Sequence, residues 1–305
     1  MKRRTIPMAG VIAAALLTMS ACGGDPLAAD TGNRSDSGNG TIVVGSADFT
    51  ESSLLAEIYA GALEAKGVTV KKTLNIGSRE AYIPALQDGS IDLIPEYTGV
   101  LDQYFDKNAS ATESDAVYAE LKSALPADLT VLAKSDAEDK DSVTVTRATA
   151  EKYHLTSIAD LKPVAGQLTL GGPPEWKTRP TGVPGLARLY GVTFGSFRAL
   201  DAGGPLSVQA LKNGQVDAAD LFSTDPNIPA DDFVSLTDPQ HLFAAQNVVP
   251  LIAKSKVTPV VSETLDKVSA ALDTATLAGL LKEVVLDKKD AADVAKEFLA
   301  SKGLS

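Results

Sequence analysis

Short apolar runs and longer helical stretches alternate along the chain. Positions 41–45 (TIVVG) form a β-branched run typical of a strand. Over 54–63, apolar residues recur at helical spacing, and Gly67 ends that predicted helix. An extended segment follows at 68–70, then a second helical stretch and another strand-like run at 91–94. Because strands and helices alternate in this way, the pattern predicts an α/β fold.

One stretch of the chain occurs twice in closely similar form. Positions 85–92 (ALQDGSID) return at 210–217 as ALKNGQVD. Each copy reads as a helix, a glycine suited to a left-handed turn, and a strand. An aromatic residue, Tyr97 or Phe222, follows eight positions beyond the glycine of its copy. The repeat indicates either two lobes with matching loops or a common connector that arose twice.

The first residues indicate export and attachment to lipid. Basic residues at 2–4, an apolar run at 11–17 and small residues at 20–21 precede Cys22. This order resembles a bacterial lipoprotein signal, so we expect a leader at 1–21 and lipid on Cys22. An uncleaved anchor helix, or a plain signal with an incidental cysteine, are the alternatives. The polar, glycine-rich segment 22–40 is predicted to be a flexible tether.

Composition narrows the classes of function. The 305 residues are 44% hydrophobic, enough for two lobes, and the net charge of -11 disfavours nucleic acid as a partner. A single cysteine and only two histidines argue against a disulfide and a Cys/His metal site, and we expect no cofactor. The chain contains no nucleophile elbow and no phosphate-binding glycine loop, so an enzyme is disfavoured.

Several short motifs occur together in one order. They are GSADFTE at 45–51, PEYTG at 95–99, GGPPE at 171–175, STDP at 223–226 and NVVP at 247–250. In these motifs the chain resembles the substrate-binding proteins of osmoprotectant ABC importers, which bind glycine betaine, choline or carnitine. The resemblance covers nearly all of the chain after the predicted tether.

The resemblance implies a two-lobed periplasmic-binding-protein fold of type II, with the ligand in the cleft. It places one lobe at 41–139 plus 247–305 and the other at 140–246. The lobes are expected to close around a small molecule, and the closed form would dock on the transmembrane subunits of an ABC permease. We expect a monomer held at the extracytoplasmic face of the cell membrane.

The family holds a quaternary ammonium group in a cage of tyrosines, since such a cation donates no hydrogen bond. Carried over by motif, Tyr97 retains one wall and Phe222 keeps an aromatic ring without the hydroxyl. The other two cage positions are Asp141 and Gln246 in this chain. Each aromatic wall contributes roughly 0.5 to 2 kcal/mol to binding of the cation. The loss of two walls would therefore lower the affinity for the cation by about one to three orders of magnitude.

The residues with which the family binds a ligand carboxylate are also altered in this chain. Ala47 stands where the family has lysine, and Val100 stands where it has threonine. Arg179 remains, in a proline-rich loop where a guanidinium can bind oxygen atoms in pairs. The alternative is a solvated surface arginine.

These changes leave the ligand open. Asp141 would attract a cation such as choline and repel a ligand carboxylate. Together with Gln246 and Arg179 it would also suit a polyhydroxylated or phenolic solute. The alternatives are that the motif alignment slips by one residue, or that Asp141 and Gln246 point to solvent at the hinge. A ligand sensor or an envelope scaffold of the same fold is the alternative function.

Two further expectations concern single residues. Asp48 and Glu51 have the spacing of a capping box for the helix that carries 54–63. Trp176, the only tryptophan, is predicted either to line the mouth of the cleft or to pack in a partly buried position.

Overall fold

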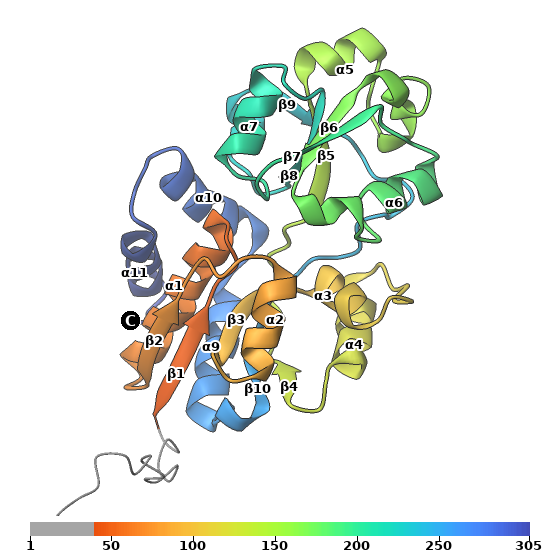
Figure 1. Ribbon diagram of the computed structural model, residues 1–305. Helices are drawn as coiled ribbons and strands as arrows, with labels where there is room; N and C mark the ends of the chain where they lie inside the picture. Colours follow the sequence, from red (N-terminus) through yellow and green to blue (C-terminus); the bar gives the residue numbers. More distant parts are fainter. Residues whose placement is uncertain (1–39) are drawn as a thin grey trace, which may run out of the picture. The chain divides into compact units, whose positions relative to one another are not determined.

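The computed structural model describes residues 40–305, which form one compact unit (Figure 1). The predicted leader, the lipid site at Cys22 and all but the last residue of the tether lie outside the described residues. Within 40–305, no helix is long and apolar enough to cross a membrane.

The first lobe is built on a five-stranded sheet in which β1, β2 and β3 run parallel and β10 is antiparallel to its neighbours. In sheet order the strands are β2 (Thr69–Thr73), β1 (Thr41–Gly45), β3 (Leu93–Tyr97), β10 (Val248–Ala253) and β4 (Leu129–Val131). Its helices are α1 (Thr50–Ala65), α2 (Arg79–Gln87), α3 (Thr98–Phe105), α4 (Ser114–Ala124), α9 (Pro259–Ala271), α10 (Thr274–Val285) and α11 (Ala291–Ser301).

The helix expected over 54–63 is α1, and its apolar face is fully buried in the core of the first lobe. The C-terminal helices α9, α10 and α11 pack against α1. Val268, Leu277 and Phe298 join the same core from these three helices, as their apolar spacing predicts.

The second lobe has a sheet of the same design. In sheet order its strands are β7 (Ser196–Ala199), β6 (Thr169–Gly172), β8 (Ala218–Phe222), β5 (Asp141–Thr146) and β9 (Phe233–Ser235). The main helices are α5 (Arg147–Tyr153), α6 (Val183–Gly185), α7 (Pro205–Lys212) and α8 (Asn227–Ala230), with a short turn η3 (Pro174–Lys177) after β6.

The internal repeat marks equivalent positions in the two lobes. The glycine of each copy has a positive φ, 80° in the first and 67° in the second. In each copy the final aspartate then accepts a hydrogen bond from a neighbouring strand: Val43 N donates to Asp92 Oδ2, and Thr169 N donates to Asp217 Oδ2, both at 2.8 Å. The shared contacts and strand order favour matching lobes over coincidence.

Two segments that connect the sheets run side by side. Glu138 and Asn247 form an antiparallel bridge, and Asp139 N donates to the carbonyl of Gln246 at 3.1 Å. The main chain therefore leaves the first sheet and returns to it at adjacent points.

Candidate functional site

A cavity of about 270 Å³ is lined by residues from both lobes. All seven residues expected from the sequence to contact ligand line this one cavity: Ala47, Tyr97, Val100, Asp141, Arg179, Phe222 and Gln246. Trp176 lines it too, and with only 1% of its surface exposed it is buried more deeply than a residue at the cleft mouth. We take this cavity as the candidate site.

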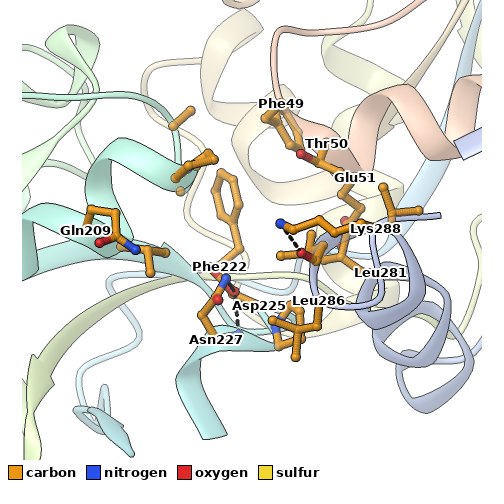
Figure 2. A pocket seen from close by; sticks show the side chains of 18 residues that line it. Phe49, Thr50, Glu51, Gln209, Phe222, Asp225, Asn227, Leu281, Leu286 and Lys288 are labelled. Carbon is orange, nitrogen blue, oxygen red and sulfur yellow. Dashed lines mark hydrogen bonds between the residues drawn. The ribbon is translucent and has the colours of Figure 1, made fainter. Parts of the chain in front are cut away.

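A second cavity, of about 320 Å³, shares Phe49 and Phe222 with the candidate site and extends toward α10 (Figure 2). Several of its polar side chains already have partners: Asn227 donates to Asp225 at 2.8 Å, and Lys288 Nζ donates to the Val285 carbonyl at 2.6 Å. Of the buried side-chain atoms that lack a partner within 40–305, none belongs to a residue lining this larger cavity. Two such residues line the candidate site.

Aromatic rings form part of the cavity wall. The ring centroid of Phe49 lies 5.2 Å from that of Phe222 and 6.1 Å from that of Tyr97. Phe49 therefore contacts both aromatics predicted from the sequence, one from each lobe. The motif comparison did not single out Phe49, although it lies within the GSADFTE motif directly before α1.

The expected capping box at the start of α1 is wrong. Phe49 is the N-cap of α1, and no side chain caps it. Glu51 is instead buried and accepts two hydrogen bonds of 2.7 Å, from Tyr97 Oη and from Thr224 Oγ1. Because Tyr97 belongs to β3 and Thr224 follows β8, tertiary contacts with both lobes take the carboxylate that local spacing assigned to the helix end.

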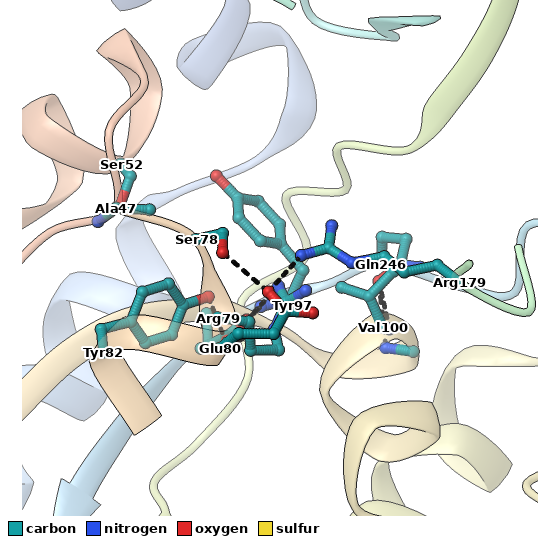
Figure 3. Close-up of polar contacts among 12 residues, drawn as sticks. Ala47, Ser52, Ser78, Arg79, Glu80, Tyr82, Tyr97, Val100, Arg179 and Gln246 are labelled. Atoms are coloured by element: carbon teal, nitrogen blue, oxygen red, sulfur yellow. Dashed lines mark hydrogen bonds and ion pairs between the residues drawn. The ribbon is translucent and has the colours of Figure 1, made fainter. Parts of the chain in front are cut away.

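A buried ion pair supports the first-lobe side of the cavity (Figure 3). Arg79 donates to both carboxylate oxygens of Glu96, at 2.7 and 2.8 Å. Tyr82 Oη adds a 2.7 Å hydrogen bond, and Tyr97 N donates to the same carboxylate at 2.9 Å. The pair therefore fixes the backbone that carries Tyr97, and no local pattern in the sequence indicates it.

Arg179 is held by a contact between the lobes. Its guanidinium donates to Glu80 at 3.0 Å, and Ser78 donates to the same carboxylate at 2.7 Å (Figure 3). Partial burial by itself would raise the pKa of Glu80, but the hydrogen bonds from Arg179 and Ser78 lower it to about 2. Arg179 is thus a partly buried residue at the cavity rather than a free surface arginine.

The side-chain amide of Gln246 forms hydrogen bonds within the described chain through its oxygen and not through its nitrogen. Its Oε1 accepts hydrogen bonds from Gly99 N and Val100 N, both at 3.0 Å, at the start of α3. Both partners are donors, which assigns the oxygen to that side. The Nε2 group is buried, and no other atom of 40–305 accepts its hydrogen bond. Both N–H donors of the Gln246 side chain are therefore free for another partner.

Two aspartates lie on one face of the second sheet, on neighbouring strands. Across the β5–β8 ladder, Asp141 pairs with Phe222 and Val143 pairs with Asp220. Residues two positions apart on a strand share a face, so Asp141 and Asp220 lie on the same side of the sheet. Asp220 is 1% exposed, and in the described chain its carboxyl oxygens have no hydrogen-bond partner other than the carboxyl group of Asp141. Burial raises the pKa of both aspartates, and the neighbouring charge of Asp141 raises that of Asp220 further. The motif comparison did not include Asp220, although an acid inside the apolar run AADLF is a visible signal.

We expect the protein to become more stable as the pH falls from 7.5 to 5. Burial raises the pKa of several carboxyl groups, which are Glu51, Asp102, Asp139, Asp141 and Asp220. For Asp102 the value is about 7. Between the unfolded pKa, near 4, and the raised folded pKa, the native state holds more protons, so its stability falls as the pH rises.

Urea unfolding at pH 5 and pH 7.5 measures this difference. An unfolding midpoint that is higher at pH 7.5 would contradict it. The Asp102→Asn variant, which removes one of these groups, should show a smaller difference between the two pH values.

Two α/β lobes of matching strand order, with a cavity lined by aromatic and charged side chains from both, define a two-lobed solute-binding protein. Residues 40–301 match the model of the family described as the substrate binding domain of ABC-type glycine betaine transport systems. The chain belongs to this family. The family expected from the sequence motifs is thereby confirmed, and its members are binding domains of transporters rather than enzymes.

Individual relatives agree with this assignment. The chain is 30% identical over 276 residues to the glycine betaine-binding protein YehZ of Escherichia coli, covering 86% of this chain and 90% of that protein. It is 26% identical to the ergothioneine transport permease/ergothioneine binding protein EgtU of Helicobacter pylori, over 86% of this chain and 48% of that protein.

Solved structures show the same fold. A crystal structure of a glycine betaine/carnitine/choline ABC transporter protein superposes with a TM-score of 0.68 at 24% identity, over 86% of this chain and 99% of the other. The two-lobed periplasmic-binding-protein fold is therefore confirmed.

Proposed function

We propose that this protein is the extracytoplasmic receptor of an ABC importer and captures a small organic cation of the glycine betaine and choline class. The assignment of a cation rests on the wall of the candidate site. There the carboxylates of Asp141 and Asp220 lie on the same sheet face as the ring of Phe222. Aromatic faces and carboxylates both attract a cation, and together they disfavour a ligand carboxylate.

The capture step follows from the contacts between lobes. Glu51, which lines the larger cavity, and Arg179, which lines the candidate site, each join groups of the two lobes. In our proposal the lobes, 41–139 plus 247–305 and 140–246, close on the cation, and binding residues are Tyr97, Asp141, Arg179, Phe222 and Gln246, with Ala47 and Val100 in the wall. Closure excludes water, which strengthens attraction between the cation and the carboxylates.

The remaining parts of the proposal concern location and partners. The closed receptor delivers its ligand to the transmembrane subunits of the permease, acts as a monomer, and is held at the membrane by lipid on Cys22. The family match supports the permease partner. The sequence pattern before residue 23 supports the lipid anchor.

Calorimetric titration of the full chain with choline and with glycine betaine tests the proposed ligand class. We expect choline to bind at least about ten-fold more tightly, because betaine adds a carboxylate that faces Asp141. Tighter binding of betaine would contradict the role given to the acidic wall. The protein must be shown to be folded, by circular dichroism, in the same preparation.

A second candidate is a polyhydroxylated or phenolic solute. The unpartnered donor of Gln246 and the unpartnered acceptor of Asp220 favour it, because hydroxyl groups satisfy both. Heat on titration with such solutes, and none with either cation, would select this function instead.

A further inference from the structure

Asp220 has no hydrogen-bond partner in the described chain other than the neighbouring carboxyl group of Asp141. It lies in the middle of β8, next to the buried residues Ala219 and Leu221. On the neighbouring strand, a Cβ atom at Gly172 would lie 3.3 Å from the Cβ of Asp220, so the sheet itself closes one side. Asp220 also lines the cavity, so a hydrogen-bond donor on a ligand can approach it from that side.

Two other acidic side chains that line the candidate site, Asp139 and Asp201, already have hydrogen-bond donors within the protein. Asp139 accepts hydrogen bonds from Ser223 Oγ at 3.2 Å and from Thr224 N at 3.0 Å. Asp201 accepts from the backbone of Leu206 at 2.9 Å and of Ser207 at 2.8 Å. Asp220 differs from these two acids because no backbone N–H, side-chain amide or alcohol group of 40–305 donates to either of its oxygens.

A buried polar group without a partner lowers stability, and natural proteins retain such groups mainly at functional sites. Burial favours the neutral form of Asp220, but a cation bound beside it favours the ionised form. An ionised carboxylate accepts hydrogen bonds and donates none. A fully methylated ammonium group offers no donor, so attraction of charge alone would leave the oxygens of Asp220 unsatisfied. Gln246 lacks a hydrogen-bond acceptor, because its Nε2 has no partner in the described chain.

We propose that Asp220 is a specificity-determining residue that selects cations carrying a hydrogen-bond donor, a hydroxyl or an N–H, close to the charge. This inference rests on the proposed function and deepens it. A hydroxyl group suits the site especially well, since it donates to a carboxylate and also accepts from an amide such as that of Gln246.

Four synthetic cations separate charge from hydrogen-bond donation. Choline has a hydroxyl, and its methyl ether has the same charge and no donor. Dimethylethanolamine, protonated at pH 7, has a hydroxyl and an N–H, and its methyl ether keeps the N–H alone. We expect the unaltered chain to bind choline about ten-fold more tightly than choline methyl ether, the effect of one charge-assisted hydrogen bond. The ether that retains only N–H shows whether that donor can replace the hydroxyl.

The Asp220→Leu variant should bind choline and its methyl ether with equal affinity. Asp220→Asn keeps the size and one acceptor, so it should retain part of the preference, and it serves in place of the leucine variant if that one does not fold. Asp102→Asn is the matched control, because Asp102 is also buried with an unpartnered oxygen but does not line the cavity. It should leave the ratio of affinities unchanged.

Urea unfolding without ligand gives a readout that a structural role would not produce. If Asp220 serves binding, Asp220→Asn should raise the unfolding midpoint, because it removes an unpartnered buried carboxylate. A lowered midpoint would mean that Asp220 stabilises the fold, and this would overturn the inference.

The binding outcomes separate this inference from the proposed function. Equal affinity of the unaltered chain for choline and its methyl ether would overturn the role of Asp220 and leave capture of a cation standing. Binding of none of the four cations would overturn both.

Discussion

Replacing Arg79 with alanine should lower the free energy of unfolding by about 3–5 kcal/mol, as expected when one member of a buried ion pair is removed. Glu96, with no exposed side-chain surface, would lose both hydrogen bonds from the guanidinium and remain as a buried charge held by Tyr82 and Tyr97 N. Urea unfolding at pH 7.5, followed by circular dichroism, measures this loss.

A matched control is available on the surface. Arg147 forms a bidentate contact with Asp232, but both side chains are more than half exposed. Solvent screens such pairs, so Arg147→Ala should leave the unfolding midpoint almost unchanged. Equal losses of unfolding free energy in the two arginine variants would show that burial of the Arg79–Glu96 pair adds nothing to stability.

Replacing Trp176 with alanine should lower the free energy of unfolding by about 3–5 kcal/mol and also weaken ligand binding. The indole is 1% exposed and stacks on Phe243 with centroids 6.2 Å apart, within the core of the second lobe. The backbone around it is equally tight, since a Cβ atom at Gly182 would lie 2.0 Å from the carbonyl oxygen of Trp176. Loss of the ring would therefore loosen the loop that carries Arg179.

Trp176→Phe keeps an aromatic ring and should recover most of the lost stability. Unfolding is followed by circular dichroism, because the chain has no other tryptophan to report by fluorescence. Affinity is measured by calorimetry on variants shown to be folded. An alanine variant as stable as the unaltered protein would mean that the second lobe does not depend on this side chain.

The fold could be predicted because its signals are local and repeated. The TIVVG strand and the α1 helix follow from spacing alone, and the repeated helix–glycine–strand unit is a sequence pattern that already indicates two similar lobes. The prediction of a capping box was wrong because the contacts of Glu51 are distant in sequence. Nothing near Glu51 in sequence shows that Thr224, 173 positions away, would donate to it.

The same distinction explains which site residues could be predicted. The seven residues carried over by motif lie together because each stands at a strand end, in a loop or, for Val100, in the first turn of α3 at the cavity. Arg79 could not be found in this way, since it is at the start of a helix, where arginine is usually solvated, and its partner Glu96 is 17 positions further on. Asp220 was detectable in principle, because strand interiors rarely contain an unpaired acid.

The paired connections at Glu138 and Asn247 have a consequence for how this chain can be rebuilt. Since the backbone departs and returns through one antiparallel bridge, everything between them is a continuous insertion with adjoining ends. A short turn could join those ends and restore an uninterrupted first lobe. The second lobe can thus be exchanged as a cassette, together with the ligand-binding residues that it contributes, without altering the strand order of its host.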